Sequence, residues 1–150
     1  MARPKPLIAS LAGSPDEIEA QLYEALQRGD LEGLLALWAD EDEIVCIHPG
    51  GTRLIGPAAI RASFEALFAN GGIRIQPEQV HRVQHVGLAV HHLVERIEVI
   101  TEKGPQRAWV LATNVYLKTA QGWRLAAHHA SPGTAHEPST SGGDPPAILH

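Results

Sequence analysis

Two neighbouring segments near the end of the chain carry side chains that can hold a ligand or exchange a proton. Residues 106–118 and 123–131 have the pattern of β-strands, and the first is rich in β-branched and aromatic residues. Asn114, Tyr116 and His128 stand at alternating positions, which places them on one side of a sheet. A histidine changes charge near neutral pH, and a buried amide must be hydrogen-bonded. We therefore predict that this side lines a small-molecule pocket.

The register of this hairpin depends on its turn. A three-residue loop at 120–122, ending in a glycine, pairs Asn114 with His128, and we favour this register. A two-residue loop would instead pair Asn114 with Ala127 and turn His129 toward the pocket. The two loops therefore predict different polar residues inside the pocket.

The other side of the same hairpin is broad and mostly apolar. In the favoured register it includes Trp109, Leu111, Trp123, Leu125 and His129. We predict that this outer face packs against a second copy of the chain and forms a homodimer.

Composition narrows the possible functions. A formal net charge of -5 argues against a nucleic-acid or anionic-membrane surface, because binding phosphates requires clustered lysines and arginines. Cys46 is the only cysteine, so no internal disulfide can form. The apolar run after the basic N-terminus is too short for a signal peptide, and no run approaches the length of a membrane span. A soluble cytoplasmic protein that binds neither nucleic acid nor membrane is therefore expected.

Turn and cap residues divide the chain into an arm at 1–13, one domain at 14–132 and a Pro/Gly/Ser-rich tail at 133–150. Both the arm and the tail are expected to be flexible, the tail because its composition cannot bury enough apolar surface. Capping residues and apolar periodicity predict helices at 15–28, 31–39 and 57–69. Further strands are predicted at 44–48, 53–55, 73–86 and 88–101. This order predicts an α+β fold in which a curved, cone-shaped antiparallel sheet wraps over three N-terminal helices and leaves a cavity.

Several short motifs, together with this order of elements, resemble a known superfamily. They are Gly29-Asp30-Leu31-Glu32-Gly33, Leu37-Trp38-Ala39-Asp40, His48-Pro49, Gly56-Pro57-Ala58-Ala59-Ile60, Gly122-Trp123 and His128-His129-Ala130-Ser131. With them the chain resembles the nuclear-transport-factor-like superfamily and, within it, the SnoaL-like and ketosteroid-isomerase-like branch. It is also similar to the association domain of calcium/calmodulin-dependent kinase II. The resemblance covers residues 15–131 and implies a cystatin-like α+β roll that dimerises through its outer sheet face.

The resemblance to ketosteroid isomerases implies two catalytic positions. Their general base precedes a proline after the second helix, which corresponds to His48 here, and their acid donor in the oxyanion hole falls at Asn114. Their oxyanion tyrosine falls at Leu22, with Tyr23 beside it. An imidazole can abstract a proton and an amide can stabilise an oxyanion, so His48 and Asn114 are candidate catalytic residues.

The resemblance to the kinase association domain concerns its pocket arginines, which fall at His92, Asn114 and Ala130. None of them is an arginine here, so a pocket for a small carboxylate is not implied. The same comparison favours His92 over His91 as the residue that faces the pocket.

Other residues are expected to line the pocket without acting chemically. The candidate ligand-binding residues are Trp38, Phe64, His92, Tyr116 and His128. The nine histidines are dispersed and form no paired-ligand motif, so we expect neither a metal nor a cofactor.

The prediction is therefore a small-molecule-binding and dimerisation domain with a mainly apolar pocket. The alternative is a cofactor-free isomerase, hydrolase or dehydratase acting on a small hydrophobic substrate, with His48 as general base and Asn114 as oxyanion donor. The binding domain is preferred, because the catalytic pattern of the isomerases is incomplete.

Overall fold

The computed structural model describes residues 13–133. Apart from Gly13 and Gly133, the predicted arm and tail lie outside the described residues. The helices are α2 (Pro15–Arg28), α3 (Leu31–Leu35) and α4 (Pro57–Leu67), with the 3-10 turn η1 (Phe68–Asn70) after α4. The strands are β1 (Val45–Ile47), β2 (Arg53–Ile55), β3 (Ile75–Gln84), β4 (Leu88–Thr101), β5 (Gly104–Thr119) and β6 (Gly122–Pro132). No helix in this part of the chain is both long and apolar enough to cross a bilayer.

The ends of α2 follow from local sequence. The Ser14 hydroxyl accepts a hydrogen bond from the backbone N–H of Glu17 at 3.2 Å, and Pro15 occupies the first turn. Gly29 ends the helix in the left-handed conformation at φ 67°, which a glycine adopts without steric cost. The predicted boundaries of this helix are confirmed.

Helix α3 is shorter than the predicted helix at 31–39, because the chain after Leu35 pairs with the sheet instead. The backbone N–H of Leu125 donates to Leu37 O at 2.8 Å, and that of Ala39 donates to Leu125 O at 2.7 Å. These bonds place Trp38 beside β6 in a short parallel bridge. Trp38 therefore enters the core from the sheet edge.

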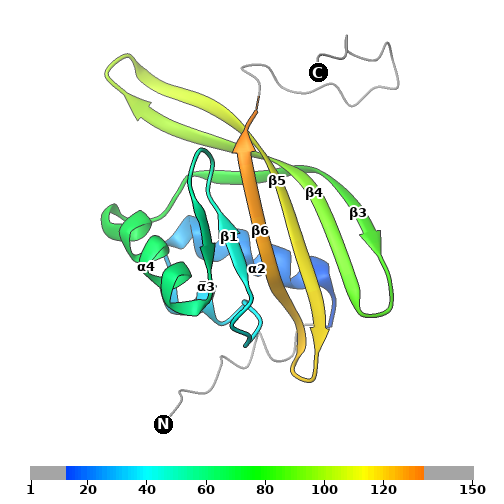
Figure 1. The fold of residues 1–150 in the computed structure, drawn as a ribbon. Coiled ribbons are helices and arrows are strands. Elements are labelled where there is room, and N and C mark those ends of the chain that lie inside the picture. The colour runs from blue at the N-terminus through cyan, green and yellow to red at the C-terminus, as the bar shows by residue number, and fades with distance from the viewer. Residues whose placement is uncertain (1–12, 134–150) are drawn as a thin grey trace, which may run out of the picture.

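The six strands form one sheet in the order β2-β1-β6-β5-β4-β3. All neighbours are antiparallel except β1 and β6, which are parallel. The sheet curves, its edges β2 and β3 do not pair, and the helices lie on one face (Figure 1). The predicted α+β fold with a curved sheet over N-terminal helices is confirmed.

The β5–β6 hairpin combines features of both predicted registers. Thr119 pairs with Gly122, so the turn has two residues and the three-residue loop was wrong. A β-bulge at Ala126, between the Tyr116–Leu125 and Val115–Ala127 pairs, then shifts the register by one residue. The favoured pairing of Asn114 with His128 is therefore present after all.

The bulge also corrects the predicted outer face. Trp123 and Leu125 were assigned to that face by simple alternation, but both are buried and Leu125 lines the interior cavity. Beyond the bulge, His129 is exposed on the outer face, as predicted. One extra residue thus changes the side of every residue between the bulge and the turn.

Candidate functional site

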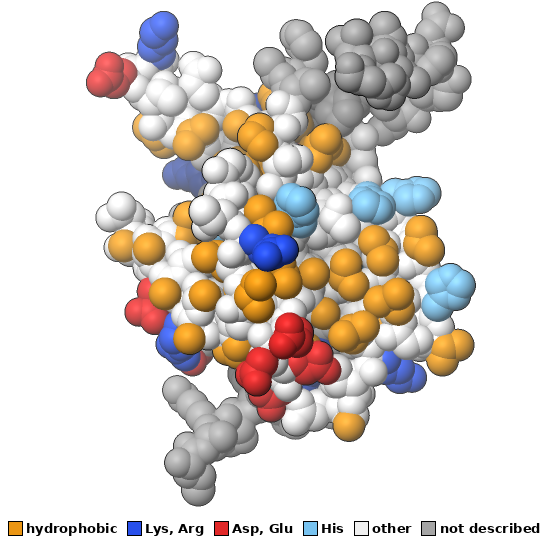
Figure 2. All heavy atoms as spheres, viewed as in Figure 1, with side chains coloured by type: hydrophobic (Ala, Val, Ile, Leu, Met, Phe, Trp, Pro, Cys, Tyr) orange, Lys and Arg blue, Asp and Glu red, His pale blue; other side chains and the backbone are white. Residues whose placement is uncertain are grey.

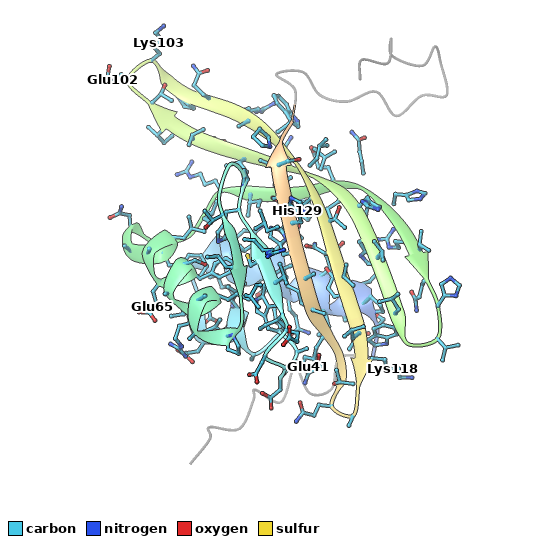
Figure 3. All side chains as sticks on the ribbon, viewed as in Figure 1. Glu41, Glu65, Glu102, Lys103, Lys118 and His129 are labelled. Atoms are coloured by element: carbon cyan, nitrogen blue, oxygen red, sulfur yellow. The ribbon has the colours of Figure 1, made fainter. Side chains whose placement is uncertain are left out.

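A cavity of about 350 Å³ lies between the helices and the inner face of the sheet. Its polar lining comes from Glu95 on β4, His48 after β1 and His128 on β6. Its apolar lining consists of Leu22, Leu26, Trp38, Pro49, Phe64, Leu67, Ile73, Ile75, Ile97 and Leu125. Figure 3 shows the side chains that fill the space between helices and sheet around it. The cavity therefore places a few titratable groups in a hydrocarbon wall.

Glu95 is a carboxyl group in an apolar environment. It is 3 % exposed, and the Tyr23 hydroxyl donates to its Oε2 at 2.6 Å. Burial raises the pKa of Glu95 to about 7, a rise that the hydrogen bond from Tyr23 opposes and the charge of Glu19 adds to. Its Oε1 makes no hydrogen bond to the described residues. Glu95 can therefore give or take a proton near neutral pH.

His128 is a neutral imidazole at the same cavity. Its Nδ1 lies 2.6 Å from Oδ1 of Asn114, and an amide oxygen only accepts, so Nδ1 carries the proton. Burial lowers the pKa of His128 to about 4, with smaller contributions from His48 and His129. The other ring nitrogen, Nε2, is then an acceptor.

His48 is fixed by the hydroxyl of a helix residue. Ser63 on α4 donates to Ile60 O at 2.9 Å, so its oxygen accepts from His48 Nε2 at 3.1 Å. The ring also packs edge-on against Phe64, with centroids 5.1 Å apart. Burial lowers the pKa of His48, so the ring is neutral at pH 7 and its Nδ1 is unprotonated. Nδ1 makes no hydrogen bond within residues 13–133 and can accept a proton.

Glu95 and His128 are joined by a chain of hydrogen bonds behind the cavity wall. His128 donates to the Asn114 amide oxygen at 2.6 Å. The Asn114 amide nitrogen donates to the Tyr23 hydroxyl at 3.2 Å, and Tyr23 donates to Glu95 at 2.6 Å. Asn114 is itself 0 % exposed. Its role in this arrangement is to orient His128 and Tyr23.

A second buried carboxylate, Glu19 on α2, holds the far side of this network. Its Oε2 accepts from the Tyr116 hydroxyl at 2.6 Å and contacts His91 Nδ1 at 2.8 Å. The Asn114 amide nitrogen also lies 3.4 Å from this oxygen. A carboxylate only accepts, so Glu19 fixes which end of the Asn114 amide faces His128.

Nucleophilic and metal chemistry have little support at this site. Burial and the nearby charge of Glu95 raise the pKa of Cys46 to about 12, so its thiol stays protonated and is a poor nucleophile. Within the described range, no group of three or more His, Cys, Asp or Glu side chains could hold a metal ion. The arrangement is suited to hydrogen bonding and proton transfer by side chains.

With the fold and the cavity in place, comparison with known proteins gives a family. Residues 16–135 match the SnoaL-like domain. The chain belongs to this family. No curated protein matches this chain.

Solved structures agree with this assignment. The SnoaL-like domain is 33% identical to a proposed calcium/calmodulin-dependent protein kinase type II association domain from Thiobacillus denitrificans, with a TM-score of 0.75 over 88% of this chain and 100% of that chain. It is 30% identical to a proposed dehydratase of the NTF2-like family from Streptomyces avermitilis, with a TM-score of 0.69 over 78% of this chain and 92% of that one. An NTF2-like protein with a cystatin-like fold from Novosphingobium aromaticivorans is 19% identical, with a TM-score of 0.64 over 77% of each chain, and supports the fold alone.

The structure places the predicted site residues in three environments. Four of them line the cavity: Trp38, His48, Phe64 and His128. Asn114 and Tyr116 are buried behind the wall, where their polar groups bind other side chains, so the predicted oxyanion donor does not reach the cavity. His92 lies on the outer face, bonded to Thr113 at 3.0 Å. The choice of His92 over His91 is therefore reversed, because strand alternation turns His91 inward.

Sequence reasoning missed Glu95, Glu19 and the role of Tyr23. Each had a signal in the apolar pattern. Glu95 follows Ala89, His91 and Leu93 on the inner side of β4, and Glu19 lies next to Ile18 and one turn before Tyr23 on the buried side of α2. An acidic residue on a buried face needs a partner, and that requirement marks it as a candidate.

Proposed function

We propose that this SnoaL-like domain binds a small, mainly apolar molecule that carries a hydrogen-bonding group. The cavity carries this proposal: about 350 Å³ lies in an apolar wall interrupted by Glu95, His48 and His128. Ligand pockets commonly combine such a wall with a few convergent polar atoms. The two neutral imidazoles present acceptor nitrogens, so the ligand is expected to carry a hydroxyl or another donor.

Binding can be tested by closing the cavity without touching its polar groups. Ile73, which lines the cavity, is the residue to enlarge. Cyclohexanol serves as the probe, and binding is followed by the line shifts of assigned cavity methyl groups in NMR titration. Ile73→Trp should weaken binding about tenfold or more, whereas Ile100→Trp, on an exposed residue of β4, should not. Equal binding to both variants would place the ligand elsewhere.

A second function, acid–base catalysis, is favoured by one observation. The pKa of Glu95 is raised to about 7 by burial, which keeps much of the carboxyl protonated at neutral pH. In a dehydration, His48 Nδ1 would take a proton from carbon while the Glu95 carboxylic acid gives its proton to the departing hydroxyl as water. The Streptomyces avermitilis relative, named as a proposed dehydratase, supports this reading. We propose cofactor-free dehydration or isomerisation, with His48 as base, Glu95 as acid and Asn114 as a positioning residue.

This reaction can be tested on a β-hydroxy ketone. The probe 3-hydroxycyclohexanone would lose water to give an enone that absorbs ultraviolet light. Glu95→Gln and His48→Ala should each lower the rate about 100-fold or more, since each removes a proton-transfer group. His48→Ala should leave the melting temperature nearly unchanged, because His48 is only half-buried. Full activity in both variants would exclude these roles.

Self-association is the other part of the proposed function. Leu111 is 51% exposed on the outer face, and Trp109 on the same strand is half-buried. Figure 2 shows many hydrophobic side chains gathered on this face. The Thiobacillus denitrificans relative, named as a proposed association domain, supports self-association. We propose a homodimer that buries this face, including Trp109 and Leu111.

A further inference from the structure

Three histidines lie in one row across the outer face of the sheet. Strand register pairs His81 on β3 with His92 on β4, His92 with Thr113 on β5, and Thr113 with His129 on β6. All three histidines are exposed, and they line a single groove of about 470 Å³. We call His81, His92 and His129 the histidine row. His129 is labelled in Figure 3, and Figure 2 shows histidines on the same face as the hydrophobic side chains.

The neighbouring row on the same face, two residues away along each strand, is entirely apolar. It runs across all six strands as Ile55, Val45, Ala127, Val115, Val90 and Val83. On the other side of the histidine row, Val94 pairs with Leu111 and Leu111 with Ser131. The histidine row is therefore set within the surface that the proposed homodimer would bury.

Few other charges face the histidine row. Arg53 lies at its far end, where it pairs with Ile47 and Ile47 with His129. Glu78 lies one row away, paired with Val94, and Arg96 lies one row further along β4. Their side chains contact each other at 3.7 Å. Within the described residues, no carboxylate stands in the row itself to pair with an imidazolium.

We propose that the histidine row makes homodimer formation depend on pH, with the dimer favoured while the imidazoles are neutral. This inference rests on the proposed homodimer. Pairing two outer faces would remove water from six imidazoles, three from each copy. Burial favours the neutral form of a histidine, and like charges brought together repel. The monomer therefore binds protons more tightly than the dimer, and acidification drives dissociation.

The dissociation constant should be measured by analytical ultracentrifugation at about pH 8 and about pH 6, on either side of the imidazole range. The dissociation constant of the wild-type dimer should be at least about tenfold higher at the lower pH. A triple variant, His81→Gln with His92→Gln and His129→Gln, keeps polar side chains that cannot become charged. The dissociation constant of its dimer should therefore change little between the two pH values. The matched control is His85→Gln, an exposed histidine outside the row, which should behave as wild type.

Three outcomes would overturn the proposal, and they differ in what else they reject. A wild-type dimer whose affinity is the same at both pH values excludes only the pH dependence. An equal loss of affinity in wild type and the triple variant shows that acid acts on other groups. A chain that stays monomeric at both pH values rejects the homodimer as well.

Discussion

The Nδ1 atom of His128 lies 2.6 Å from Oδ1 of Asn114, its partner on the neighbouring strand. The same amide donates to the Tyr23 hydroxyl, which in turn holds Glu95. One buried asparagine thus connects two titratable groups that face the cavity. A network of this kind fixes the orientation of its members only if each polar atom keeps a partner.

Asn114→Ala should destabilise the protein by about 2 kcal/mol, because it leaves the buried Nδ1 of His128 without a partner. Urea unfolding would measure the change. Gln84→Ala removes an exposed amide from β3 and should have almost no effect. Equal, small effects for both substitutions would show that the Asn114 bonds carry no net stability.

The imidazole of His128 should titrate with a midpoint at about 4, because burial lowers its pKa. In the unfolded chain a histidine has its ordinary pKa of about 6.5. The folded state therefore binds fewer protons between these values, and stability is lost as pH falls from about 6.5 through about 4. NMR titration of the His128 ring protons measures the midpoint directly, and a value near 6.5 would contradict burial in the neutral form.

Glu95→Gln should change how stability depends on pH. The pKa of Glu95 is raised from 4.5 to about 7, so the folded state holds this proton to higher pH than the unfolded state does. The protonated Glu95 carboxyl therefore contributes fully to stability below about pH 4.5, and this contribution is lost as the pH rises through about 7. As the pH rises from about 5 to about 8, the free energy of unfolding of Glu95→Gln should therefore increase by about 2 kcal/mol relative to that of wild type.

Urea unfolding at the two pH values gives this difference. Glu102→Gln, at the tip of the β4–β5 hairpin in Figure 3, is the control and should follow wild type. A Glu95→Gln curve parallel to wild type would mean that Glu95 ionises at its ordinary pKa.

Leu111→Glu and Trp109→Glu should abolish the homodimer, because each places a carboxylate in an interface that excludes water. Leu111 is the cleaner site, since it is 51% exposed and its replacement does not disturb the core. Val86→Glu, in the β3–β4 turn with 92% exposure, should leave the dimer intact. Light scattering after size-exclusion chromatography reads the mass, and an unchanged dimer in both outer-face variants would rule out this interface.

Much of the fold is readable from the sequence because its signals are local. Ser14, Pro15 and Gly29 define α2 through capping and backbone conformation, whichever way the rest of the chain folds. Alternation along β4 and β5 also gives the long strands. The second half of the predicted helix at 31–39 could not be placed this way, since its backbone forms hydrogen bonds with the backbone of Leu125, far along the chain.

The candidate site was harder to read, because strand faces depend on register. Leu125 faces the cavity because of the bulge at Ala126. No residue type in the sequence predicts a bulge at this position. His91 and His92 are adjacent, so an error of one residue exchanges a buried histidine for an exposed one. Glu95 was overlooked because an acidic residue in a strand usually faces water, and only its inward position gives it a raised pKa.

The most direct test of the acid–base account is the titration of the Glu95 carboxyl group. Carbon-13 NMR of glutamate-labelled wild type, with Glu95→Gln used to assign the resonance, follows this one group through the pH range. The account predicts a midpoint at about 7. A midpoint near the ordinary value of 4.5 would mean that the cavity holds a fully ionised carboxylate at neutral pH, and Glu95 could not serve as the acid.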